Sequence, residues 1–461
     1  MYNKKMDKKG GRKMKKDMTS GSPLKLIIAF AIPLVIGNIF QQFYNMVDSI
    51  IVGKYVGKVA LAAVGSTSSL NFMIIGFGIG ICSGFGIPIA QSFGGKKIKD
   101  MKKYIMNAFY LCVILTLIMT VVTYVALPTI LTIMKTPSDI YDQAYGYISV
   151  IFLGLFATML YNILASILRA IGDSKTPLYF LILSSIINVI LDLLFITQFH
   201  MGAPGAAYAT VIAQFISGVA CFVYMKKKTD ILKFEHDEKA FDKRYCQKLI
   251  SMGLPMALQF SITAIGSVVI QTAVNTLGSD IVAAVTAAMK ISVMLTQPLE
   301  TLGLTMATYG GQNLGAMKIE RIFKGLRVAF GIGLIYCILA FIFVYFTSDI
   351  LSLLFIDASE KMIMECIKQY LIYNSICYYI LSVLFILRNL LQGLGYSFLA
   401  MFGGVAEMIA RCIVAFCFVS QLGFTAICIA NPLAWIFADI VFITAWVIKR
   451  KELKRLEMQD A

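Results

Sequence analysis

A polar stripe on the first apolar segment of the chain is the first place where chemistry could occur. Within residues 24–50, the side chains of Gln41, Tyr44, Asn45 and Asp48 recur at positions i, i+3, i+4 and i+7. In a helix this spacing places them on one face. Because polar and charged side chains are costly in lipid, we expect that face to point into the protein.

A second set of polar residues lies in another apolar segment, residues 177–197. Asn188 and Asp192 are one helical turn apart there. At ~1.5 Å of rise per residue, Asp48 and Asp192 both fall in the outer part of a membrane. Two carboxyls flanked by amides can bind Na⁺ through oxygen ligands or share one proton. They can also form a structural network between helices. We favour a site that couples transport to a cation.

Five further charged residues lie inside apolar segments, and two of them, Glu300 and Asp439, stand near the inner ends of their spans. Glu407 and Arg411 stand one turn apart, so we expect them to form an ion pair. Such a buried pair is structural as often as it is functional, and both readings stay open. Lys290 has no evident partner in the sequence; it could line a cleft or pair across helices.

The elements that carry these residues are membrane helices. The chain has 461 residues, of which 59% are apolar and 14% charged, which excludes a soluble multidomain enzyme. Several stretches of at least 21 residues contain no charge, and about 20 apolar residues suffice to cross a bilayer as a helix. We predict an all-α polytopic membrane protein with twelve spans. They cover residues 24–50, 59–88, 104–128, 143–168, 177–197, 205–225, 249–275, 282–312, 328–347, 369–391, 397–420 and 425–448.

The net charge of +16 follows this topology. Of the 41 Lys and Arg residues, 34 fall on one side of the predicted spans, Arg388 included, and five on the other. This asymmetry places both termini in the cytoplasm. Since the positive charge records orientation, we expect no nucleic-acid partner.

The chain is internally duplicated. The motif that begins at Gln91 recurs at Gln312, an offset of 221 residues, and Gly57 matches Gly278 at the same offset. Each half holds six spans, so the two six-helix lobes are expected to be related by a pseudo-two-fold axis along the membrane normal, with substrate between them. We divide the chain into a Lys-rich cytoplasmic tail (1–22), an N-lobe (23–226), an exposed cytoplasmic linker (227–247), a C-lobe (248–448) and a basic cytoplasmic tail (449–461).

Signatures of catalysis and of ATP use are missing from the sequence. It contains no G-x(4)-G-K-[ST] phosphate-binding loop. Its two histidines, His200 and His236, lie in or near predicted loops, and no metal-ligand spacing or nucleophile–base pair occurs. We therefore expect no enzymatic activity, no cofactor and no ATPase subunit.

The motifs and their order resemble those of the multidrug and toxic compound extrusion (MATE) family. The resemblance covers about residues 20–450. It implies an antiporter of the prokaryotic inner membrane that exports organic, often cationic and amphipathic, compounds in exchange for Na⁺ or H⁺. We expect it to work as a monomer among membrane lipids. The matching motifs are Pro33 with the Gln41–Asp48 stripe, Ala62–Gly65, Gln91-x-x-Gly94, Leu168–Pro177, Gly311–Ala316 and Gln392–Gly395.

The resemblance also assigns residues. It maps the family's N-lobe cation site onto Asp48, Gln41, Asn188 and Asp192, with Asn162 as a further member, and Na⁺ would bind at Asp48, Asp192 and Asn188. A C-lobe cation site of another branch is not expected, because residues 249–279 contain no acid. Candidates for the substrate cleft or for structural polar contacts are Tyr44, Asn45, Lys290, Glu407 and Arg411.

Two other functions remain as alternatives. A flippase for lipid-linked oligosaccharides of the same superfamily would share the two-lobe form, but it would favour a basic cleft for pyrophosphate. Lys290 and Arg411 are the only positive residues that we place inside the spans. A channel is the third possibility, and saturable ion-coupled exchange would argue against it.

Overall fold

A computed structural model describes residues 17–134, 136–229 and 232–460 of the chain. These residues form helices and short connections, and no strand occurs among them. Ten helices are long and apolar enough to cross a membrane, and two bent helix pairs bring the number to twelve. The all-helical, twelve-span prediction is therefore confirmed for this part of the chain.

The first half of the chain forms the N-lobe, which we define as α1 to α7. Two of these helices continue at their C-terminal ends as short π-helical segments: η2 follows α1, and η3 follows α6. The elements are α1 (Pro23–Ile51), η2 (Val52–Val56), α2 (Lys58–Gly94), α3 (Ile98–Ile133), α4 (Tyr141–Leu153), α5 (Leu155–Ala170), α6 (Lys175–Leu193), η3 (Leu194–Gln198) and α7 (Gly202–Lys228).

The second half forms the C-lobe, which we define as α8 to α15. A one-turn 3₁₀ helix, η4 (His236–Glu238), lies in the connection between the lobes. The elements are α8 (Lys243–Asn275), α9 (Ser279–Gly315), α10 (Ile319–Ser352), α11 (Lys361–Ile376), α12 (Tyr378–Gly393), α13 (Ser397–Ile413), η5 (Val414–Phe418), α14 (Val419–Leu422) and α15 (Phe424–Asp460).

The backbone repeats the duplication that the sequence indicates. Gly57 and Gly278 precede α2 and α9 with φ of 109° and 97°, a region that glycine adopts readily. Lys96 and Met317, also 221 residues apart, both have positive φ, at 58° and 54°. The α4–α5 pair bends by 46° and the α11–α12 pair by 51°. Equivalent positions in the two halves thus share unusual backbone geometry.

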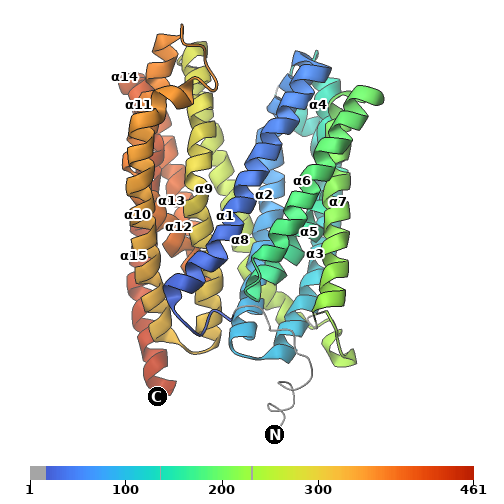
Figure 1. Cartoon of the computed structure of the whole chain (residues 1–461), viewed down its shortest axis with the longest axis vertical. Coiled ribbons are helices and arrows are strands. Elements are labelled where there is room, and N and C mark those ends of the chain that lie inside the picture. Colours follow the sequence, from blue (N-terminus) through green and yellow to red (C-terminus); the bar gives the residue numbers. More distant parts are fainter. Residues whose placement is uncertain (1–16, 135, 230–231, 461) are drawn as a thin grey trace.

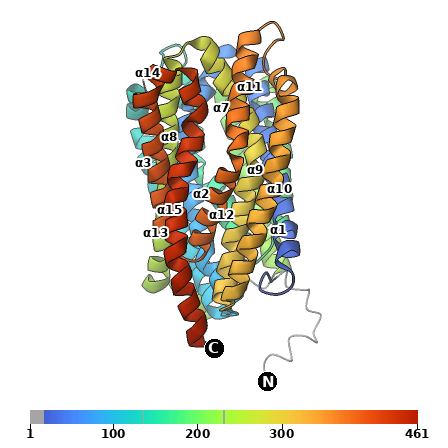
Figure 2. The same ribbon diagram turned by 90° about the vertical axis from the view of Figure 1, so that its left-hand side faces the viewer.

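The two lobes stand side by side, with α1 and α8 between them (Figure 1). We call the end at which α1 begins and α15 finishes the terminal end, and the opposite one the far end. In a view turned by 90°, the C-lobe helices run along a common axis and α15 extends beyond them at the terminal end (Figure 2). The long axis of the bundle is therefore the expected membrane normal.

The interlobe contact between α2 and α8 requires glycine. A Cβ on Gly84 would meet the backbone of Gly253 in α8, and one on Gly80 would lie 2.7 Å from backbone atoms of Ala257. Real Cβ atoms do not approach other atoms so closely. Small residues therefore let these helices touch along the half of α2 that leads to the terminal end.

The predicted tails and linker are more tightly held than expected. Residues 1–16 lie outside the described part, but Met18 is buried and its N–H donates to Gln312 Oε1 at 2.9 Å. In the linker, which we expected to be exposed, Glu238 is buried and accepts a bond from Lys102 Nζ at 3.1 Å. At the other end of the chain, α15 continues as a helix through residues 449–460.

Candidate functional site

The carboxyls of Asp48 and Asp192 meet in the N-lobe. Asp48 lies near the end of α1 and Asp192 near the end of α6, and the two side chains are within hydrogen-bonding reach of each other. Asp192 is fully buried, whereas Asp48 is partly exposed. One oxygen of each, Oδ1, has no hydrogen-bond partner in the described structure. Two carboxylates this close repel each other in a low-dielectric site, so the pair requires a proton or a bound cation.

Asn188 supports this pair from one turn away on α6. The amide orientation that matches donors to acceptors directs Nδ2 to Asp192 Oδ2 at 3.3 Å. Its oxygen then accepts from the backbone N–H and the hydroxyl of Thr210 in α7, both at 3.2 Å. Thr210 is a residue that the sequence analysis missed, since it stands in an Ala-rich segment with no polar periodicity.

The stripe on α1 divides into an inner and an outer part. Tyr44 is half-buried and lies near both carboxyls, as does the buried Tyr147 of α4, which the sequence analysis also missed. The side chains of Gln41 and Asn45 are exposed and form no hydrogen bond in the described structure. Of the four residues of the predicted stripe, only Tyr44 and Asp48 therefore belong to the site around the two carboxyls.

Asn162 lies apart from the carboxyl pair in its bonding. Its Nδ2 donates to the carbonyl of Thr158 in its own helix, α5, at 2.8 Å. The Thr158 hydroxyl in turn contacts Gln214 of α7. In the described structure no hydrogen bond joins this group to Asp48 or Asp192, so Asn162 belongs to a separate contact between α5 and α7.

Two repeat-related glutamines join the lobes at the terminal end. Gln91 of α2 donates from Nε2 to the Gly393 carbonyl of α12 at 2.9 Å. Gln312 of α9 donates from Nε2 to the Ala170 carbonyl of α5 at 2.8 Å. A Cβ on Gly315 would overlap the Gln91 carbonyl oxygen. The terminal end is thus closed by a nearly symmetric pair of hydrogen bonds between closely packed backbones.

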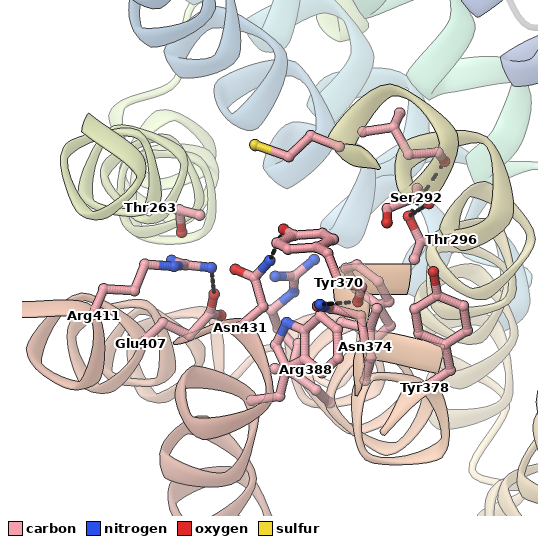
Figure 3. A pocket seen from close by; sticks show the side chains of 16 residues that line it. Thr263, Ser292, Thr296, Tyr370, Asn374, Tyr378, Arg388, Glu407, Arg411 and Asn431 are labelled. Atoms are coloured by element: carbon pink, nitrogen blue, oxygen red, sulfur yellow. Dashed lines mark hydrogen bonds and ion pairs between the residues drawn. The ribbon is translucent and has the colours of Figure 1, made fainter. Parts of the chain in front are cut away.

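The C-lobe contains a cavity of about 220 Å³. Glu407 and Arg411 of α13 form the expected ion pair on one of its walls, with Arg411 Nη2 and Glu407 Oε2 3.4 Å apart and both side chains buried. Figure 3 shows this pair on one side of the cavity and Ser292, Thr296 and Tyr378 on the other. The remaining polar lining residues are Thr263, Tyr370, Asn374, Arg388 and Asn431.

Arg388 corrects one reading of the sequence. We counted it among the loop charges on the inner side, but it lies within α12 and lines the cavity. Its guanidinium stacks over the Phe385 ring at 4.8 Å, and its Nε and Nη1 donate to Gln259 Oε1 at 3.2 and 3.1 Å in the matched amide orientation. Its position five residues before the end of a helix led us to assign it to the loop. Moving it leaves the charge asymmetry between the sides in place.

Lys290 lies outside both polar sites. It is exposed on α9, and its Nζ stands 6.0 Å from the centroid of the Phe355 ring in the connection after α10. It does not line the C-lobe cavity. Of the charges that the sequence places inside spans, Glu407 and Arg411 share one site while Lys290 has a different environment.

A duplicated helical bundle with buried acids in one lobe and a polar cavity in the other defines a membrane transporter. The MatE family profile matches residues 33–194 and 255–437. The chain belongs to the multidrug and toxic compound extrusion family of efflux transporters.

Similarity to individual relatives is distributed over most of the chain. The probable multidrug resistance proteins YoeA and YpnP of Bacillus subtilis (strain 168) are 28% and 29% identical to it. The alignments cover 75% of this chain and 78% of YoeA, and 82% of this chain and 84% of YpnP.

Solved structures share the fold. An outward-facing multidrug resistance MATE family transporter and a MOP superfamily transporter from Pyrococcus furiosus each superpose with a TM-score of 0.89 at 22% identity. Each comparison covers 96% of this chain and 100% of the other. The two-lobe fold is thereby confirmed.

Proposed function

We propose that this protein is an antiporter that exports organic compounds in exchange for protons, and that the Asp48–Asp192 pair binds the proton. The observation that supports this is the contact between two carboxyls that have no basic partner in the described structure. Such a pair takes up one positive charge and releases it when its surroundings change. The remaining polar groups around it accept or donate hydrogen bonds but carry no charge.

The position of Asn188 favours a proton over Na⁺. Na⁺ requires several hard oxygen ligands, and the Asn188 oxygen is already occupied by Thr210, while its nitrogen faces Asp192. The free acceptors are then the two Oδ1 atoms of the carboxyls. One shared proton satisfies this arrangement, whereas Na⁺ would require the other amide orientation, in which Asn188 Nδ2 donates to the Thr210 hydroxyl at 3.2 Å and the amide oxygen faces Asp192.

The closed terminal end fits a transporter that faces outward. By the positive-inside rule, the Lys- and Arg-rich side is cytoplasmic, so both termini and the Gln91 and Gln312 contacts lie at the cytoplasm of a prokaryotic inner membrane. A proton that enters from outside and binds the Asp48–Asp192 pair would then change the balance between the two arrangements of the lobes, one open to the outside and one open to the cytoplasm. The proton can shift this equilibrium only by its different affinity for the two states.

A reconstituted efflux assay tests the proposal. The protein in liposomes, loaded with a fluorescent organic cation, is given a pH gradient or a Na⁺ gradient separately, and we expect saturable efflux with the pH gradient alone. Asp48→Asn should abolish it while leaving insertion intact. Asp280→Asn, the same chemical change at an exposed position at the far end of α9, is the matched control.

The outcomes separate the parts of the proposal. Efflux driven by Na⁺ alone would contradict the assignment of the proton. Full gradient-driven efflux by Asp48→Asn would contradict the coupling site. Flux that rises without saturation would indicate a channel.

A further inference from the structure

The Glu407–Arg411 pair in the C-lobe cavity is incompletely satisfied. Arg411 Nη2 and Glu407 Oε2 face each other, but Arg411 Nη1 and Glu407 Oε1 have no partner in the described structure. Both residues are more than nine-tenths buried, at 7% and 4% exposure. An unmade hydrogen bond at a buried charge is unfavourable. The two free atoms therefore present a donor and an acceptor, side by side, to whatever fills the cavity.

The rest of the lining supplies positive charge and aromatic surface. With Arg388, two guanidinium groups and one carboxylate line the cavity, and the carboxyls of Glu300 and Asp439 lie near Arg388 and Glu407 respectively. Tyr378 and Trp435 pack against each other at 6.3 Å between ring centroids and form an aromatic wall. The hydroxyls of Tyr378 and Ser292 lie beside one another and bond to nothing else that is described.

The cavity opens beside α9. Met289 and Val293 are the exposed residues of its lining, with exposures of 40% and 39%. Figure 3 shows helices of the N-lobe beyond Thr263 of α8 and Ser292 of α9, between which the cavity lies. A ligand could thus reach the cavity past Met289 and Val293 without separating the C-lobe helices.

We propose that this cavity binds a small zwitterion with an aromatic body, whose carboxylate accepts from Arg411 Nη1 and whose ammonium donates to Glu407 Oε1. The unpaired Nη1 of Arg411 favours the carboxylate, and the unpaired Oε1 of Glu407 favours an ammonium group beside it. The volume of about 220 Å³ is below the ~300–1,000 Å³ of drug-sized sites, so the ligand is a small molecule or one end of a larger one. The inference rests on the proposed function in that this ligand would be an exported compound.

The two tryptophans of the chain make the site measurable. Trp435 lines the cavity, whereas Trp446 packs against Phe323 toward the terminal end of the C-lobe. Trp446→Phe leaves Trp435 as the single tryptophan. Quenching of its emission by 4-nitrophenylalanine, by its methyl ester and by its N-acetyl derivative compares a zwitterion, a cation and an anion of nearly equal shape. We expect saturable quenching with the zwitterion tightest and the methyl ester at least about tenfold weaker, because it loses a charge-assisted hydrogen bond.

Three variants in this background assign the contacts. Arg411→Gln should weaken zwitterion binding about tenfold or more, and Arg411→Lys should recover part of it. Glu407→Gln should remove the advantage of the zwitterion over the N-acetyl derivative. Lys290→Gln, which removes a positive charge outside the cavity, should leave all three affinities unchanged. Elution as a single monodisperse peak shows that each variant has folded.

Two results would overturn the inference. Equal affinity for the zwitterion and its methyl ester would show that the carboxylate is not recognised, and an unchanged affinity in Arg411→Gln would show the same for the arginine. Because binding is measured without any gradient, Asp48→Asn should leave it intact while efflux fails. A protein that binds the zwitterion selectively but shows no ion-coupled efflux would contradict the proposed function and leave the site in place.

Discussion

The polar sites of the two lobes differ in how their charges are balanced. In the N-lobe, Asp48 and Asp192 face each other with no basic side chain in the described structure beside them. In the C-lobe, Glu407 forms an ion pair with Arg411, and the Arg388 guanidinium lies close enough to interact electrostatically with the Glu407 carboxylate. The halves of a duplicated chain have therefore kept a common backbone while their polar sites have diverged.

This difference indicates a division of work. Two carboxyls with no basic side chain beside them need a proton or a bound cation from solution. Uptake and release of such an ion is what a coupling site requires. A cluster that already contains both signs has no need of an ion, and it recognises instead a ligand that complements its free donor and acceptor. The experiments below test this division, starting with the largest expected effect.

The acid pair should behave as a single unit in transport. Asp192→Asn should reduce pH-driven efflux to background, as Asp48→Asn does, because either change removes the shared proton site. The double variant should be no worse than either single one, since residues that act together are not additive. Initial efflux rates in proteoliposomes check this. A double variant distinctly slower than both single variants, each retaining partial activity, would show two independent sites.

The free energy of unfolding should also distinguish the two sites, and here the larger effect is expected for substitutions in the C-lobe. Removing one partner of the buried pair, as in Glu407→Leu or Arg411→Met, leaves the other charge uncompensated and should lower the free energy of unfolding by ~3–5 kcal/mol. The double variant should lose far less. Asp192→Asn should be neutral or stabilising because it relieves repulsion between carboxyls. Unfolding of the purified protein in mixed micelles by increasing denaturant measures these changes, and equal losses in both lobes would contradict the comparison.

Much of the fold could be predicted because the bilayer restricts it. Long apolar segments can satisfy their backbone only as helices, so twelve spans and the duplication followed from hydropathy and from offsets such as Gln91 to Gln312. The juxtaposition of Asp48 and Asp192 could be expected from their depth. Their role in coupling stays a prediction.

The contacts across helices could not be predicted from periodicity. Thr210 of α7 contacts Asn188, and Tyr147 of α4 lies near both carboxyls, through packing that no local sequence pattern records. Arg388 was misplaced because a charge near a helix end reads equally well as a loop residue. Met18 is a further case, since its burial beside a Lys-rich run goes with a hydrogen bond from its N–H to Gln312 Oε1 in α9, 294 residues away in the sequence.

The contact at the terminal end should respond to added volume. Gly315→Ala would force a Cβ against the Gln91 carbonyl oxygen, and overpacking of this kind costs about 1–3 kcal/mol. We expect faster hydrogen–deuterium exchange in residues 91–97 and 312–318, as the lobes separate there. Gly331→Ala in α10, where an added Cβ meets nothing within 4 Å, is the matched control. Unchanged exchange in Gly315→Ala would mean that the closed end tolerates the wedge.

The smallest expected effect concerns the linker, which carries an acid outside the membrane. The Lys99 ammonium, 2.6 Å from Asp237, holds the pKa of that carboxyl below its usual range. A carboxyl with a lowered pKa in the folded protein stabilises the docked linker at neutral pH, and this contribution is lost as the pH falls through the lowered value. Because the usual pKa of an aspartate is about 3.9, the protection of the amides of residues 236–242, measured as their exchange rates relative to the intrinsic rates at each pH, should not change between about pH 7 and pH 5. In Asp237→Asn, exchange should be slightly faster at every pH in this range, since the neutral amide cannot form the ion pair with Lys99.

A change of efflux with pH in this same interval would then arise elsewhere than in the linker, and its loss in Asp192→Asn would assign it to the N-lobe pair. A protection of the linker amides that differs between these two pH values would instead make the linker a second pH-sensitive element and would weaken the contrast between the lobes.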